Sequence, residues 1–316
     1  MRTRIFLPAH LRTAQRNLIF RTRNHSLLTN EPLMIEIGSE TVQLQPLDIT
    51  KDIPSSWGSV VQAMSLMGTS RADWANLPSL LEGMKTAGRR WQVWQLEKVV
   101  REAGKAGMSA VVVECVRAAG RTGLVLRDVR VVREAMWACR TRAVLSGWDR
   151  GETARALRNA EQIAEALEGE AHWGASKRPD GVDPRRQADV LGVLGELAAQ
   201  RAVRHQDGND VDGKVEMYVK RLVSNLEGAG AQADSDSTKT PWAATADYEL
   251  LRWVPARNGL KAARDVLGEG MPQQSLVNEA LQKLETTLKD ASDIVMGARD
   301  DTREKRRGLK WLNESE

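Results

Sequence analysis

The chain has 316 residues, of which 41% are hydrophobic and 28% charged, and its net charge is +4. These values are ordinary for a soluble globular protein with one large or two modest domains. No run approaches the roughly 18 apolar residues of a membrane-spanning helix, which argues against a membrane protein. The two cysteines, Cys115 and Cys139, match no disulfide framework or metal spacing, so we expect both to be small core residues.

Residues 1–30 are rich in arginine and contain no acidic residue. Such a composition is typical of mitochondrial transit peptides, and equally of extended arms that run along RNA. Both interpretations remain open from the residues alone. In the folded protein we expect a basic extended arm over residues 1–30, and its RNA-binding candidates are Arg2, Arg4, Arg12, Arg16, Arg21 and Arg23.

A β-hairpin is predicted within residues 31–53. Apolar and polar residues alternate on both sides of Gly38 and Ser39, as in two short strands joined by a tight turn. Pro46 ends the second strand, because proline cannot donate a hydrogen bond to a strand ladder. Serines at positions 55 and 56 then favour a helix start.

Residues 54–170 are predicted to form a body of helical hairpins. Each predicted helix is too short to persist alone in water and must bury its apolar stripe against a neighbour. Gly88 aligned with Gly123, 35 residues later, superposes apolar positions and indicates a degenerate repeat of helix pairs. The predicted helices are Trp57–Met67, Asp73–Thr86, Trp91–Ala103, Ser109–Ala119, Leu126–Leu145 and Glu152–Glu168.

The rest of the chain is predicted as further helices between linkers. A linker at His172–Asp183 precedes a second helical segment over residues 183–227, and a flexible linker follows at 228–242. Residues 243–316 are expected to form C-terminal helices with a basic tail. The helices predicted after residue 183 are Asp183–Arg204, Lys214–Leu226, Asp247–Trp253, Ala256–Leu267 and Gln273–Met296.

Basic residues concentrate in the helical body. Between Lys85 and Arg142 the sequence has thirteen basic and five acidic residues, a local net charge of +8. Arginine can hold phosphate through two parallel hydrogen bonds, and an exposed tryptophan can stack on an unpaired base. A solvated protein face is the plain alternative for such a charge run. The RNA-binding candidates are Arg89, Arg90, Arg117, Arg121 and Arg127 in the body, and Arg306, Arg307 and Lys310 beside Trp311 in the tail.

Catalytic signatures are missing from the sequence. It contains no Gly-rich phosphate loop ending in Lys-Ser/Thr, no GxSxG and no HExxH. The four histidines fall in the arm, a linker and a helix end, and we expect ordinary surface residues. The acidic stretch Asp207–Gly213 lacks the glycine and the bidentate glutamate of a calcium loop. We therefore expect no enzymatic activity, catalytic residue, metal, cofactor or small-molecule substrate.

The segment AVVVECVRAAGRTGLVLRDVRVVREAM resembles the pentatricopeptide-type helical repeats. It lacks the regular polar positions with which such repeats read bases one by one, so the resemblance implies helical hairpins without a base code. The expected fold class is mainly α, an irregular solenoid-like body of helical hairpins with a small N-terminal β-hairpin and extended basic termini.

The overall layout is similar to the fungal mitochondrial ribosomal proteins of the large subunit. This likeness runs from RNLIFRTRNHSLLTNEP through the VQLQPLD strand into the helical body. It implies a structural constituent of the mitochondrial ribosome in the matrix, which binds the rRNA phosphate backbone and neighbouring ribosomal proteins. Two alternatives are a pentatricopeptide-like organellar RNA-binding factor for transcripts and a helical accessory subunit of an enzyme.

Overall fold

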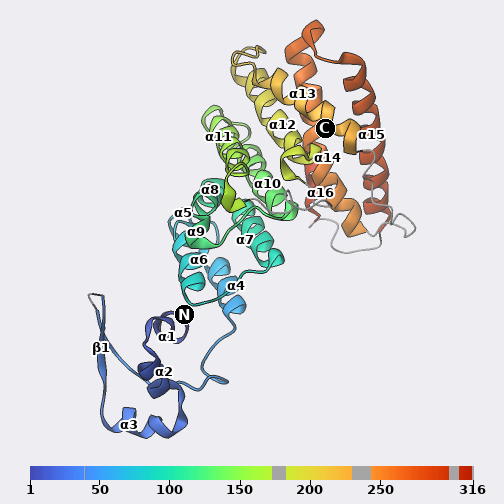
Figure 1. The fold of residues 1–316 in the computed structure, drawn as a ribbon. Helices are drawn as coiled ribbons and strands as arrows, with labels where there is room; N and C mark the ends of the chain where they lie inside the picture. The colour runs from blue at the N-terminus through green and yellow to red at the C-terminus, as the bar shows by residue number, and fades with distance from the viewer. Residues whose placement is uncertain (39, 173–182, 230–242, 299–305, 315–316) are drawn as a thin grey trace. The chain divides into compact units, whose positions relative to one another are not determined.

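The computed structural model describes residues 1–38, 40–172, 183–229, 243–298 and 306–314. The chain forms two compact units, one of residues 1–102 with 114–124 and the other of residues 103–113 with 125–316. The described part is mainly helical and has a small antiparallel sheet near the N-terminus, which confirms the predicted fold class (Figure 1). Most of the predicted linkers, at 173–182 and 230–242, and the start of the basic tail, at 299–305, lie outside the described residues.

Most of residues 2–30 lie in short helices, so the expected extended arm is wrong. Short helices bring Leu11, Ile19 and Leu28 together with Leu44, which follows the hairpin, in a small buried cluster. Apolar residues between the arginines have the spacing of helix faces, and burying them offsets the cost of ordering the segment. The elements are a π-turn at Arg2–Phe6, α1 (Leu7–His10), α2 (Thr13–Phe20), a 3₁₀ turn at Thr22–Asn24, α3 (His25–Asn30), β1 (Met34–Ile37) and β2 (Glu40–Gln43).

The predicted hairpin is confirmed, with Ile35 opposite Val42 in the antiparallel pair. The rest of the first unit consists of short helices, several of which are followed by a glycine with positive φ. These are α4 (Ser56–Met67), α5 (Arg71–Trp74), α6 (Leu77–Thr86) and α9 (Ala119–Thr122), while α7 (Val93–Lys105) and α8 (Ser109–Arg117) each contribute residues to both units.

The predicted helix Asp73–Thr86 is divided between α5 and α6, because Pro78 favours a helix start rather than a helix interior. The 35-residue spacing seen in the sequence has a structural counterpart. Gly88 and Gly123 each follow a helix in the left-handed region, with φ of 75° and 76°. A residue with a side chain is strained there, which explains glycine at both positions.

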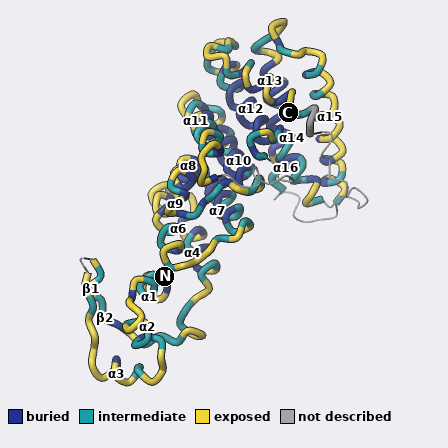
Figure 2. The backbone as a smooth tube through the Cα atoms, in the orientation of Figure 1, coloured by how far each residue is buried: buried dark blue, intermediate teal, exposed yellow. Residues whose placement is uncertain are grey.

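The second unit is built around α12 (Ala188–His205). This helix packs against α10 (Val129–Leu145), α11 (Arg150–Ala166), α13 (Lys214–Ala229) and α14 (Ala243–Leu267), and its residues 188–199 are all buried (Figure 2). The other side of α14 contacts α15 (Gln274–Gly297) and α16 (Arg307–Asn313). Short 3₁₀ turns lie at Glu170–His172, Pro184–Arg186 and Gly268–Gly270.

Helix α14 continues through Pro255, where the sequence had predicted a break between two helices. Proline removes one backbone hydrogen bond and disfavours a helix interior. Here Val254, Pro255 and Ala256 are all buried, and tight packing on α12 holds the helix together. A Cβ atom added to Gly192 on α12 would lie 2.8 Å from Cα of Ala256, so the two backbones approach closely.

Candidate RNA-binding surface

A shallow pocket lies in the first unit, where the start of α4 meets the turn between α6 and α7. Its volume is about 380 Å³, within the rough range of 300–1,000 Å³ for small-ligand sites. None of the described residues that line it is acidic. We call it the tryptophan pocket, and its wall includes Ser56, Trp57, Arg89, Arg90, Trp91 and Gln95.

The turn after α6 fixes the direction of the loop that carries Arg89 and Arg90. The amide of Gly88 donates to the carbonyl of Lys85, and the amide of Arg89 donates to the carbonyl of Met84, both at about 2.9–3.0 Å. This pair of bonds is the Schellman motif, which requires the left-handed glycine. The chain therefore leaves α6 in a defined direction, with Arg89 and Arg90 side by side in the following loop.

The indole ring of Trp91 is held at one edge by the segment that contains Thr122 and Gly123. Its indole Nε1 donates to the carbonyl of Thr122 at 3.1 Å, and the ring lies against Gly123, where an added Cβ would come within 2.9 Å of Trp91 Cδ1. Thr122 is itself buried and donates through its hydroxyl to the carbonyl of Cys115 at 2.8 Å. The indole is held by this contact while the residue also lines the pocket.

A second tryptophan, Trp57 in the first turn of α4, also lines the pocket. Its ring packs edge-on against Trp94, with 5.1 Å between centroids, and Trp94 is 51% exposed. Sequence reasoning missed Trp57 as a partner of Arg89 and Arg90. No spacing rule could have found it, because the two segments lie far apart in the sequence and line one pocket only in the folded unit.

The five candidate arginines of the body differ in their partners. Side chains of Arg89, Arg90 and Arg117 are exposed, and within the described part of the chain none of them has a hydrogen bond or ion pair. Arg121 pairs with Glu82 at 3.1 Å, and Arg127 donates to the carbonyl of Ala171 at 3.4 Å. The structure brings Arg89 and Arg90 together with the tryptophans, whereas the other three lie outside the pocket.

The N-terminal candidates lie on the surface of a folded segment rather than along a free arm. Arg2 forms an ion pair with Glu40 of β2. The small apolar cluster beneath them faces inward, so the charges are displayed outward. Exposed arginines are found at Arg2, Arg4, Arg12, Arg16, Arg21 and Arg23.

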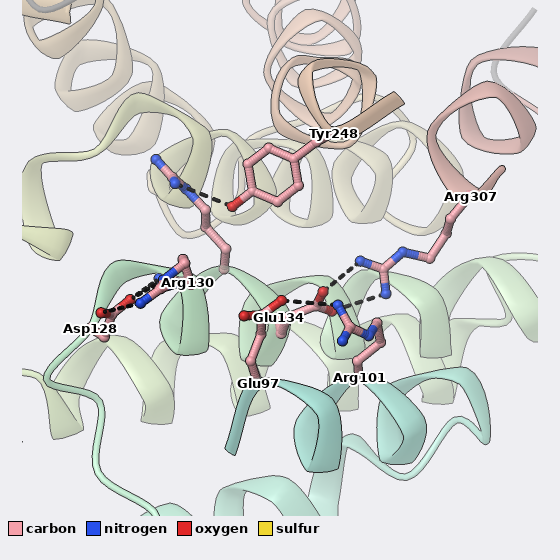
Figure 3. Close-up of polar contacts among 8 residues, drawn as sticks. Glu97, Arg101, Asp128, Arg130, Glu134, Tyr248 and Arg307 are labelled. Atoms are coloured by element: carbon pink, nitrogen blue, oxygen red, sulfur yellow. Dashed lines mark hydrogen bonds and ion pairs between the residues drawn. The ribbon is translucent and has the colours of Figure 1, made fainter. Parts of the chain in front are cut away.

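The C-terminal candidates belong to the second unit, where Arg307 contacts the protein interior. Its two terminal nitrogens donate to the two carboxylate oxygens of Glu134, at 2.8 and 2.9 Å (Figure 3). Trp311 is buried, 6.1 Å from Trp137 in an edge-on contact. Lys310 remains 65% exposed, 3.6 Å from Glu314.

Several arginines of the +8 segment pair with acids that lie elsewhere in the sequence. Arg140 and Glu196 meet at 2.6 Å, and Arg133 and Asp189 meet at 2.5 Å, with Asp189 and Glu196 both 1% exposed. Arg142 pairs with Glu152 at 2.8 Å. The local charge count therefore overstated the positive surface, because a sequence window does not include partners supplied by other helices.

One histidine takes a structural role in the second unit. His172 is buried, and its Nδ1 accepts a hydrogen bond from the amide of Leu126 at 3.1 Å, so the expected surface position is wrong for this residue. Both cysteines are buried, as expected, and burial raises the pKa of Cys115 to about 12. Across the described residues there is no group of three or more metal-ligating side chains, and no helix long and apolar enough to cross a membrane.

Comparison with known proteins shows which family the chain belongs to. The model of the family described as "Mitochondrial ribosomal protein mS27" matches residues 1–314. A relative from Neurospora crassa, "Small ribosomal subunit protein mS27", is 31% identical over 239 residues. This alignment covers 71% of the chain and 60% of the relative, so the chain spans less than two thirds of the relative's length.

These matches correct one expectation from the sequence. The large-subunit assignment is wrong, because the relative is named as a protein of the small ribosomal subunit. The error arose because basic termini and a helical body are general features of ribosomal proteins and do not distinguish the two subunits. The broader expectation, a mitochondrial ribosomal protein family with a fungal member, is confirmed.

Proposed function

The chain belongs to the family of mitochondrial ribosomal protein mS27, and from this premise we propose that it is a structural constituent of the small subunit of the mitochondrial ribosome, in the mitochondrial matrix. The family match over residues 1–314 carries the proposal. It favours this role over a transcript-binding factor and over an accessory subunit of an enzyme. The protein acts by binding and positioning, without catalysis.

Its partners are ribosomal RNA and neighbouring ribosomal proteins. The exposed arginines of the N-terminal segment, together with Arg89, Arg90 and Arg117, contact the phosphate backbone. Contacts of this kind fix the position of a protein on RNA and depend little on base sequence. Arg307 and Arg140 instead hold helices of the second unit together, because their guanidinium groups are taken up by carboxylates.

Sedimentation tests this proposal directly. The tagged full-length protein, expressed in fungal cells, is followed through a gradient of mitochondrial lysate under conditions that separate the two ribosomal subunits. We expect it to peak with the small subunit, with one marker protein of each subunit as the control. Sedimentation with the large subunit, or as free protein at low salt beside intact ribosomes, would contradict the assignment.

A further inference from the structure

The tryptophan pocket combines two features that the proposed role does not by itself explain. Its two guanidinium groups, from Arg89 and Arg90, are exposed and have no carboxylate partner among the described residues. Two indole rings, from Trp57 and Trp91, line the same hollow. Backbone electrostatics needs the arginines, but it does not need aromatic surface beside them.

Another pocket lacks this combination. It lies in the second unit beside Arg185, whose guanidinium already pairs with Asp183 and Glu168, each at 2.8 Å. Both acids line that pocket beside three arginines, and none of the described residues lining it is aromatic. Unpaired charge beside aromatic surface distinguishes the tryptophan pocket.

Polar groups around the tryptophan pocket are also suited to a ligand with hydrogen-bond acceptors. The Gln95 side-chain oxygen accepts from the amide of Gln92 at 2.9 Å, which leaves its amide nitrogen as a donor. Ser56 adds a hydroxyl group. A nucleotide presents an anionic phosphate, a flat π-face and acceptor atoms on the base edge, and matches all three kinds of group.

We propose that the tryptophan pocket binds one unstacked nucleotide of single-stranded RNA, with the base against Trp57 and Trp91 and its phosphate on Arg89 and Arg90. The inference rests on the proposed function in one respect, which is that the partner of the protein is RNA. An acidic peptide would use the arginines but would gain little from the indole rings. Base recognition is limited to stacking, so the site tolerates different bases.

Binding of short RNA analogues to the full chain tests the proposal by fluorescence anisotropy. The probes are labelled hexauridylate and an abasic ribose-phosphate chain of the same length and charge. Stacking on aromatic side chains gives at least about a fivefold preference for the probe with bases. We expect Trp57→Leu to lower this ratio, because only Trp91 is left to stack on the base, without changing the affinity for the abasic chain.

Further variants separate stacking from charge. Replacing Arg89 and Arg90 together with glutamine should weaken binding of both probes by similar factors. The matched control Arg117→Gln changes an exposed arginine outside the pocket, and the ratio between the probes should stay as in the wild type. Trp57→Phe keeps a smaller aromatic ring and should give a ratio of affinities between those of the wild type and Trp57→Leu. This more conservative variant keeps the test informative if Trp57→Leu fails to fold.

Equal affinity of the wild type for both probes overturns the proposal. It is also overturned if Trp57→Phe and Trp57→Leu both keep the wild-type ratio of affinities for the two probes. Displacement of hexauridylate by hexaglutamate at equal concentration would also overturn it, in favour of an acidic peptide. The ribosomal role fails separately. If the protein sediments with the small subunit but binds both probes equally, only the pocket proposal is refuted. If it prefers the probe with bases but does not sediment with the small subunit, only the ribosomal role is refuted.

Discussion

Arg140 on α10 and Glu196 on α12 form a two-pronged ion pair in the interior of the second unit. Arg140 donates to the two carboxylate oxygens of Glu196, through Nε at 2.6 Å and through Nη2 at 3.1 Å, and the side chains are 2% and 1% exposed. Asn258 on α14 donates to the same carboxylate at 2.8 Å, and the ring of Trp311 lies 4.2 Å from the guanidinium carbon. Three helices and the C-terminal segment thus meet at one charged pair.

Glu196→Gln should destabilise the second unit by about 3–5 kcal/mol, because it leaves the Arg140 charge buried without a counter-charge. Urea denaturation monitored by circular dichroism measures the change. As a matched control, Glu216→Gln removes a carboxylate that is 46% exposed and pairs with Lys220 on the surface of α13, and should cost less than about 1 kcal/mol. Similar losses in the two variants would show that burial does not govern the effect.

The close approach of α12 and α14 predicts opposite effects for two glycines on one helix. Gly192→Ala places a Cβ 2.8 Å from the backbone of Ala256, so the helices must separate, and we expect a loss of about 1–3 kcal/mol.

Gly195→Ala is the control, because its nearest neighbour would be Tyr218 Cβ at 4.0 Å. Alanine favours a helix over glycine by up to about 1 kcal/mol, so this variant should be unchanged or more stable. Thermal melting of both proteins distinguishes the two positions. A destabilised Gly195→Ala beside an unaffected Gly192→Ala would refute the helix-contact argument.

Arg89→Gln with Arg90→Gln should weaken binding to an RNA duplex and flatten its salt dependence by about one unit of slope per lost phosphate contact. Binding measured between low and physiological salt gives the slope. Stability should change by no more than about 0.5 kcal/mol, since both side chains are exposed without a partner in the described structure. Arg121→Gln should have a smaller effect, because Glu82 already pairs with that charge. An unchanged salt dependence in the double variant would show that these arginines are only solvated and contact no phosphate.

The buried thiols should be protected from alkylation in the folded protein. Burial raises the pKa of Cys115 from its ordinary value of 9.0 to about 12, and burial also raises the pKa of Cys139. Between pH 7 and 9 the labelling rate with iodoacetamide should therefore stay low in the native protein and rise steeply with pH in urea. Native labelling as fast as in urea would contradict the burial.

The same shift affects stability at alkaline pH. The pKa of Cys115 is higher in the folded than in the unfolded state, so its contribution to stability is fully present below about pH 9 and is lost as the pH rises toward about 12. We expect the free energy of unfolding to fall over this range, with a shallower fall in Cys115→Ala. Equal slopes in the two proteins would show that other groups dominate the alkaline transition.

The amino-acid sequence by itself determined the local features of this protein. The glycine turns at Gly88 and Gly123, the hairpin around Gly38 and most helices of the body follow from backbone preferences and short-range periodicity, which are written within a few residues. The ribosomal family, by contrast, was implied by a likeness in overall layout, and that likeness assigned the wrong subunit.

Tertiary structure alone decided which arginines are available to a partner. Arg140 and Arg89 look alike in the sequence, yet one is buried against Glu196 and the other is exposed beside Trp57 in the tryptophan pocket. It also decided that residues 2–30 fold onto Leu44 and that α14 continues through Pro255. In each case the stabilising contact joins segments far apart in the chain, and burial and electrostatic pairing depend on distance in space, which sequence spacing does not encode.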